Sequence, residues 1–225
     1  MKAIASLPSY FAAVLTALVC ATGGFESAAQ SFLLQPGTAG TKDTWMSEQD
    51  DFDHGGWNYL QANQDQFQQR IFIQFDLAGI AGPVTSAFLG LYRFDQYNAD
   101  TLILNAHAVT QDWAQNNGWS AMPASSGTVA ASAQASGTNA VWVEWDITTL
   151  VQDWMGGTRA NYGVTIFAPD GGDGGYQRFV SSNDQAAAQF QPYIRGQLVP
   201  EPSAAALIAL GLAALGLPQA RRRAR

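Results

Sequence analysis

Apolar and polar residues alternate along six short segments in the middle of this 225-residue chain. In the clearest one, RIFIQFDL at residues 70–77, every second side chain is apolar. The other segments are residues 87–94, 102–109, 141–148, 162–168 and 192–198. A period of two is that of a β-strand with one buried face, and the breaks between these segments are rich in turn-forming residues. The pattern therefore predicts an all-β fold, an antiparallel β-sandwich.

Two segments depart from this alternation. In ITTLVQDWMGG, residues 147–157, Leu150, Val151 and Trp154 recur at intervals of three and four. This spacing predicts one short helix, which ends at the two glycines. The stretch GTVAASAQASGTNA, residues 127–140, is small and polar, and predicts a long flexible loop.

The first 29 residues have the pattern of a secretory signal peptide. A single lysine precedes the apolar run YFAAVLTALVCA, and small residues before Gln30 suit cleavage by signal peptidase there. Cleavage nearer Ala21 is an alternative. A lipid anchor on Cys20, the only cysteine, is another, although the bulky Val19 disfavours its processing. Removal of this predicted helix leaves a domain without disulfides.

The C-terminal segment, residues 199–225, has three parts in a fixed order. The motif Val199, Pro200, Glu201, Pro202 comes first, an apolar run of residues 204–217 follows, and four arginines lie at the end. As a helix the run is about 21 Å long, short of the ~30 Å hydrocarbon core. It predicts a transmembrane-type helix that is a poor permanent anchor.

This segment resembles the PEP-CTERM sorting tail. The resemblance implies transient anchoring in the inner membrane of a Gram-negative bacterium, with the arginines inside. It also implies cleavage near the Pro-Glu-Pro motif by an exosortase, and release to the cell surface or the extracellular matrix. The chain is thus expected to divide into a signal peptide at 1–29, a β-sandwich domain at 30–198 and a sorting tail at 199–225.

Charge excludes one class of partner. Residues 30–199 contain six basic and 16 acidic residues, so their formal net charge is −10. Such a surface repels phosphate backbones, and we expect no nucleic-acid binding. The same repulsion acts on a polyuronate.

The middle of the chain resembles the DNRLRE-type, disaggregatase-related domains. The resemblance rests on RIFIQFDLAGIAGPVTSAFLGLYRF, DWAQNNGWSAMP, WDITTLVQDWMGGTRANYGVTI and FVSSND followed by QPYI, which together span most of residues 41–198. The letters DNRLRE are absent, and the family's early Asn-Tyr-Gly is replaced by HGGWN. The resemblance implies a jelly-roll β-sandwich that acts as a carbohydrate-binding module, with alginate among the proposed ligands.

Aromatic residues in loops are the main candidates for sugar contacts, because an exposed ring stacks on the apolar face of a pyranose. The candidates for this role are Trp45, Trp57, Tyr59, Tyr97 and Tyr176. Arg70 begins one predicted strand and Arg93 lies at the end of the neighbouring one, and side by side they would grip a uronate carboxylate. A structural salt bridge from Arg70 to an aspartate is the alternative.

Two acidic, glycine-rich turns are candidates for structural calcium. DDFDHGG offers Asp50, Asp51 and Asp53, and PDGGDGG offers Asp170 and Asp173. Calcium takes six to eight oxygen ligands, which one such turn supplies only in part. Ordinary solvated loops are the alternative, and no other cofactor is predicted.

An enzyme is the least favoured class. Glu144 and Asp146 share one strand face, as a glycosidase acid pair would, but Asp146 and Thr148 also suit capping of the following helix. We therefore expect an exported, non-catalytic protein that binds carbohydrate or associates with the matrix. A structural or adhesive matrix protein without specific glycan binding is the alternative, and a polysaccharide-degrading enzyme comes third.

Overall fold

The computed structural model describes residues 29–36, 40–64, 67–98, 102–134, 140–169 and 175–200. Within this part, Gln30–Val199 forms one compact unit of two antiparallel sheets. The predicted signal helix and the predicted helix after Pro200 lie outside the described residues. No helix in the described ranges is long and apolar enough to cross a membrane.

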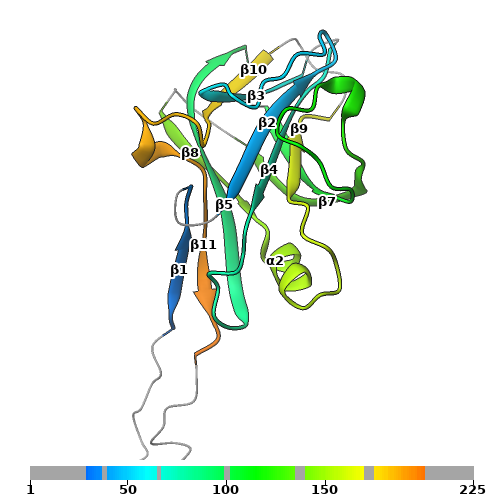
Figure 1. Ribbon diagram of the computed structural model, residues 1–225. Helices are drawn as coiled ribbons and strands as arrows, with labels where there is room; N and C mark the ends of the chain where they lie inside the picture. The colour runs from blue at the N-terminus through cyan, green and yellow to red at the C-terminus, as the bar shows by residue number, and fades with distance from the viewer. Residues whose placement is uncertain are drawn as a thin grey trace, which may run out of the picture. The chain divides into compact units, whose positions relative to one another are not determined.

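The first sheet is built around one long strand (Figure 1). Its strands are β1 (Ser31–Leu34), β3 (Tyr59–Gln64), β5 (Val84–Tyr97), β8 (Val141–Asp146), β10 (Gly175–Val180) and β11 (Tyr193–Leu198). Along one edge of β5, the first half pairs with β11 and the second half with β10, while β8 pairs along the other edge. β1 extends the sheet beyond β11, and β3 extends it beyond β10.

The second sheet has five strands in the order β2-β4-β9-β6-β7. They are β2 (Thr41–Ser47), β4 (Gln69–Phe75), β6 (Ile103–Val109), β7 (Ser125–Gln134) and β9 (Val164–Phe167). One α-helix, α2 (Thr148–Met155), and two 3-10 turns, η1 (Trp119–Ala121) and η2 (Ala188–Phe190), complete the described elements. This architecture confirms the predicted β-sandwich with one short helix, and the jelly-roll connectivity stays a prediction.

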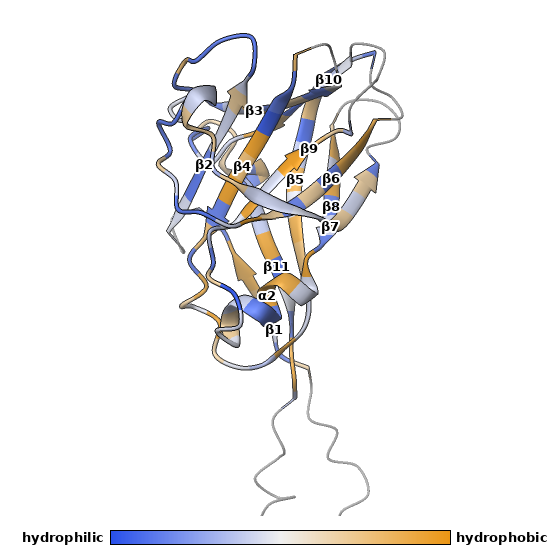
Figure 2. Ribbon diagram, turned by 90° about the vertical axis from the view of Figure 1, so that its right-hand side faces the viewer, coloured by the Kyte–Doolittle hydropathy of each residue, from blue (hydrophilic) through white to orange (hydrophobic). Residues whose placement is uncertain are grey.

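The main core lies between the two sheets. Figure 2 shows that hydrophobic residues concentrate on the strands. Trp145 of β8 is completely buried, and its indole Nε1 donates to the Leu104 carbonyl oxygen of β6 at 2.9 Å. This bond joins the two sheets through the core. Leu150 and Val151 bury one face of α2, as their helical spacing predicts.

The prediction of a flexible loop at 127–140 is wrong for most of its length. Strand β7 occupies Ser125–Gln134 and pairs with β6, with two irregularities in the register. Because β7 is an edge strand whose side chains are mostly exposed, only the small Ala131 and Ala133 pack against the core. Small residues therefore form a strand here without a marked alternation of apolar and polar positions.

Strand β2 was also missed, because it is buried on both faces. Trp45 packs into the main core, while Met46 packs with Phe72, Val109 and Trp113 in a second cluster on the outer side of its sheet. Because successive residues of β2 are buried, apolar and polar positions do not alternate along this strand.

A buried carboxylate on β2 makes stability depend on pH. The Asp43 carboxylate accepts hydrogen bonds from the Ser182 amide at 2.7 Å and from the Ser181 and Ser182 hydroxyls at 3.1 and 2.7 Å. Burial nevertheless raises its pKa above the ordinary value of 3.8. The folded state therefore binds this proton more tightly than the unfolded state, and the stabilisation is lost as pH rises through the raised pKa.

We expect the free energy of unfolding of the wild type, relative to that of Asp43→Asn, to fall as pH rises from about 4 to 7. Urea unfolding of both proteins at each pH measures this difference, and the other titrating groups are common to both. A difference that stays constant, or that grows with pH, would contradict the prediction.

Candidate functional site

Four of the seven predicted ligand-binding residues lie close together on the first sheet. Tyr59 is on β3, Tyr176 on β10 and Tyr97 on β5, and Trp57 immediately precedes β3. The register pairs Tyr176 directly with Tyr97. Tyr59 pairs with Val180, four residues along β10 from Tyr176, so Tyr59 lies about 13 Å along the strand direction from the Tyr97–Tyr176 pair, at ~3.3 Å per residue.

These aromatic side chains form two contacting pairs that are partly exposed. Tyr97 and Tyr176 stack with their ring centroids 6.0 Å apart and an interplanar angle of 23°. The Trp57 ring meets Tyr59 edge-on at 5.3 Å. Tyr97 is 57% exposed and Trp57 is 40% exposed. The two pairs therefore offer flat ring surface to a ligand.

Arg178 lies between the two pairs of rings. Its guanidinium is 4.9 Å from the Tyr59 ring centroid and 4.6 Å from that of Tyr176. Its Nε donates to Gln61 Oε1 at 2.6 Å, and its charge pairs with Asp95 at 3.5 Å. We call Tyr59, Asp95, Tyr97, Tyr176 and Arg178 the tyrosine–arginine cluster.

Arg178 was not among the predicted site residues, although the sequence contains a pattern that indicates it. In the segment YQRFV, Tyr176 and Arg178 share one strand phase, while Gln177 and Phe179 share the buried one. A candidate aromatic residue thus has a charged neighbour on the same face.

Burial raises the Tyr59 pKa, so this phenol stays protonated at neutral pH.

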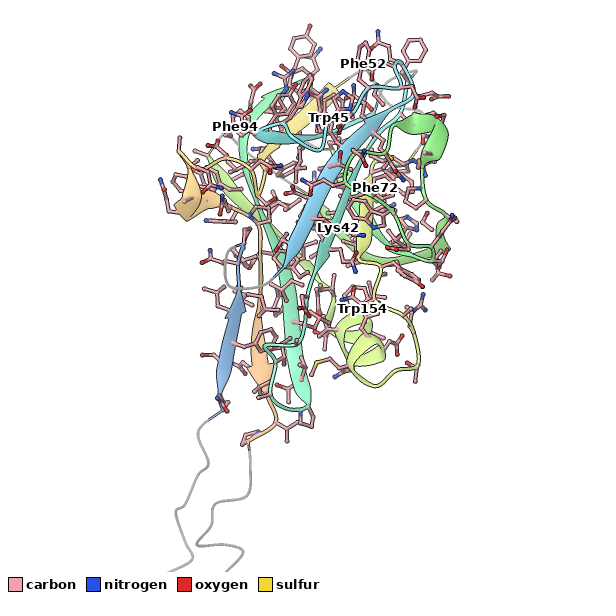
Figure 3. All side chains as sticks on the ribbon, viewed as in Figure 1. Lys42, Trp45, Phe52, Phe72, Phe94 and Trp154 are labelled. Carbon is pink, nitrogen blue, oxygen red and sulfur yellow. The ribbon has the colours of Figure 1, made fainter. Side chains whose placement is uncertain are left out.

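Trp45 was expected to be exposed and is buried, with 4% of its surface accessible. Its ring stacks on His54, with 3.7 Å between centroids, and on Tyr59 at 5.8 Å. Trp45 therefore supports the cluster from inside and does not present a face to solvent. Figure 3 shows its position near β2 and β3.

The two arginines predicted to lie side by side belong to different sheets. Arg93 of β5 is fully buried, because it shares the inward phase of Leu89 and Leu91. Arg70 of β4 lies over the Phe167 ring at 4.1 Å and donates through Nε to Gln68 at 2.9 Å. They do not form the predicted grip for a carboxylate.

The predicted calcium ligands of the first acidic turn have separate partners. The Asp51 carboxylate accepts from the Ser120 amide at 2.8 Å and from its hydroxyl at 2.7 Å, and these bonds lower its pKa. Asp50 lies 3.6 Å from His54, and Asp53 accepts from the Gly55 amide at 2.8 Å.

Across the ranges that the structure describes, no three acidic, histidine or cysteine residues gather closely enough to hold a metal ion. Asp170 and Asp173 lie outside those ranges. Structural calcium stays a prediction.

The two carboxylates considered for catalysis are each held by a neighbour. Arg195 binds Glu144 through two bonds of 2.6 and 2.7 Å and lowers its pKa. The Asp146 carboxylate accepts from the Thr148 amide at 3.0 Å and from its hydroxyl at 2.6 Å, at the start of α2. A glycosidase needs an acid whose pKa is raised, and Glu144 has the opposite shift.

Partly exposed aromatic rings on one sheet of a β-sandwich provide flat apolar surface of the kind that stacks on sugar rings. The chain belongs to carbohydrate-binding module family 96, whose family model matches residues 37–195. The match includes every residue of the tyrosine–arginine cluster. It defines a binding module, and no enzyme family matches the chain. No curated protein matches it.

Proposed function

We propose that this protein binds a polysaccharide through the tyrosine–arginine cluster. The observation that carries the proposal is the stacked pair of Tyr97 and Tyr176, with Asp95 and Arg178 fixed beside it. Exposed rings stack on the apolar faces of sugar rings, while the polar groups hydrogen-bond to hydroxyls. Because Arg178 is already held between two rings, little side-chain entropy remains to be lost on binding.

The charge distribution favours a neutral glycan. Four of the six basic side chains of Gln30–Val199 form ion pairs: Lys42–Asp112, Arg159–Asp153, Arg178–Asp95 and Arg195–Glu144. Arg93 is buried, and Arg70 is held by Gln68 and Phe167. A polyuronate would have to compete with these partners and overcome the net negative charge. Uncharged sugars meet neither obstacle.

Affinity electrophoresis tests this function. The purified protein is run through gels that contain laminarin, galactomannan or polygalacturonate at increasing concentration. We expect saturable retardation by a neutral polymer and none by polygalacturonate. Retardation by polygalacturonate alone, decreasing steeply with salt, would contradict the neutral ligand class. Failure of every polymer to retard the protein would favour the structural or adhesive alternative.

We also propose that the protein is exported and sorted to the cell surface or the extracellular matrix. In this proposal signal peptidase removes residues 1–29, and an exosortase cuts near Val199, Pro200, Glu201 and Pro202. The compact unit ends at Val199, whose amide donates to the Pro83 carbonyl at 2.8 Å, so the motif begins where the folded body stops. Mass spectrometry of the extracellular protein tests both cuts, and an intact 225-residue chain in the cytoplasm would contradict them.

A further inference from the structure

We propose that the first sheet carries a second carbohydrate-binding surface, centred on Trp142, that takes the same neutral glycan chain as the tyrosine–arginine cluster. This inference rests on the proposed function. The surface, called here the Trp142 surface, consists of Tyr92, Trp142, Glu144, Phe190, Tyr193 and Arg195.

Strand phase places these side chains on the outer face of the sheet. Along β8, Val143 and Trp145 are buried, so Trp142 and Glu144 point the other way. Tyr92 of β5 pairs directly with Trp142, and Tyr193 of β11 shares the outward phase with Arg195. A solvent-facing sheet surface is ordinarily polar. Aromatic residues at these positions therefore require another explanation.

The four aromatic rings form one connected group. Phe190 of η2 stacks on Tyr92 at 4.1 Å, with an interplanar angle of 17°. Trp142 meets Tyr92 edge-on at 5.3 Å and lies 4.6 Å from Tyr193. All four side chains are half-buried, so each keeps part of its surface in water. Phe94, labelled in Figure 3, follows Tyr92 by two residues on β5 and is 40% exposed.

Gly90 makes room for the polar part of the surface. A Cβ atom at this position would lie 2.3 Å from the Tyr193 ring carbon Cζ, so only glycine lets the ring lie across β5. The Tyr193 hydroxyl then donates to Glu144 Oε1 at 2.6 Å, from the opposite side of the strand. Burial and Glu144 raise the pKa of Tyr193 to about 12, so it remains a hydrogen-bond donor.

Glu144 and Arg195 are fixed but accessible to a ligand. Their side chains are 28% and 49% exposed, and two charge-assisted hydrogen bonds hold them together. Such a bidentate pair is rigid, and its opposite charges cancel. It can accept and donate hydrogen bonds to hydroxyl groups, and it offers no free positive charge to a carboxylate. The first site also has an oppositely charged pair, Asp95 and Arg178, joined by a single contact of 3.5 Å.

The two surfaces lie along the same strand. Tyr92 and Tyr97 are five residues apart on β5, which corresponds to about 16 Å at ~3.3 Å per residue. An odd spacing would put them on opposite faces of a regular strand, but the register of β5 with β10 shifts between Arg93 and Asp95, and this irregularity brings Tyr97 to the face of Tyr92. One extended glycan chain can therefore contact both surfaces. The second contact is then intramolecular, so the affinity for a polymer exceeds the affinity for a fragment that fills one surface.

Titration calorimetry tests this inference with the neutral polymer that retards the wild type, laminarin or galactomannan, and with its disaccharide, which is too short to reach both surfaces. We expect the wild type to bind two disaccharides, and Trp142→Ala to bind one. The same substitution should lower the affinity for the polymer about tenfold. Arg195→Gln, at an exposed position, should weaken the second disaccharide site without unfolding the protein. Phe52→Ala, which removes a 70% exposed ring outside both surfaces, is the matched control and should change neither value.

The possible failures are distinguishable. If Trp142→Ala and Arg195→Gln both retain two sites and the full affinity for the polymer, the second surface is wrong and the first site stands. If the wild type binds none of the glycans, the proposed function and this inference fail together. Where Trp142→Ala lowers the unfolding midpoint strongly, the result for Arg195→Gln decides.

Discussion

Replacing both Tyr97 and Tyr176 by alanine is expected to weaken binding of the neutral glycan by roughly 10- to 100-fold, about 1.4 to 2.8 kcal/mol. The substitutions remove the stacked pair and the ring over which Arg178 lies. Each lost aromatic contact is worth about 0.5–1.5 kcal/mol, so two give an effect of this size. Stability should change little, because Tyr97 is 57% exposed and Tyr176 is only half-buried.

Two control variants show whether a loss of affinity comes from the missing rings or from a change in folding. The double replacement by phenylalanine keeps both rings and should bind within a few-fold of the wild type. Phe52→Ala removes an exposed ring elsewhere and should bind normally. Affinity is measured by calorimetry and folding by the thermal midpoint. An alanine double variant that binds as tightly as the wild type would show that the tyrosine–arginine cluster is not the site.

Trp145→Ala is expected to lower the free energy of unfolding by about 3–5 kcal/mol. The side chain is completely buried, so its removal leaves a large cavity between the sheets. It also removes the hydrogen bond from Nε1 to the Leu104 carbonyl and the contact with the Phe179 ring, whose centroid is 6.3 Å away. A buried carbonyl left without its donor adds to the loss.

Chemical denaturation measures this change, and a second tryptophan serves as its control. Trp154 of α2, shown in Figure 3, is only half-buried, so Trp154→Ala should have a smaller effect. Trp145→Phe should fall between the wild type and Trp145→Ala, because it fills part of the cavity. A loss below about 1 kcal/mol for Trp145→Ala would contradict the account of the core.

The fold was largely predictable because most strands have one face in the core and one face toward solvent. Residues 70–77 and 141–148 alternate as their burial requires, and the helical spacing of Leu150 and Val151 correctly placed α2. Prediction failed where the environment is the same on both faces. β2 is buried on both, and β7 is largely exposed, so neither shows a period of two.

The candidate site was predictable only in part. Trp57, Tyr59, Tyr97 and Tyr176 were chosen as loop aromatics, and the pairing of β3, β10 and β5 brings them together. Which aromatic residue is buried depends on tertiary contacts, and the stacking of His54 on Trp45 is not visible in the sequence.

The sequence also contains a pattern that indicates the Trp142 surface, although this surface was not predicted from it. Trp142 and Glu144 occupy the strand phase opposite the buried Val143 and Trp145, and Tyr193 and Arg195 do the same around Ile194. An aromatic residue at a solvent-facing position of a strand indicates a surface with a role other than contact with water. Whether the outward-facing side chains of β8 and β11 lie next to each other depends on the pairing of both strands with β5, which the sequence does not specify.

The most direct measurement is an NMR titration of the purified protein, with tyrosine rings labelled, against the neutral glycan that retards it. The account predicts saturable shifts of the Tyr97 and Tyr176 ring signals. The signal of Tyr162, which packs against the cluster of Met46 and Phe72 on the other sheet, should stay unchanged. Saturable binding that leaves Tyr97 and Tyr176 unchanged would contradict the central claim that this module holds its ligand on the outer face of the first sheet.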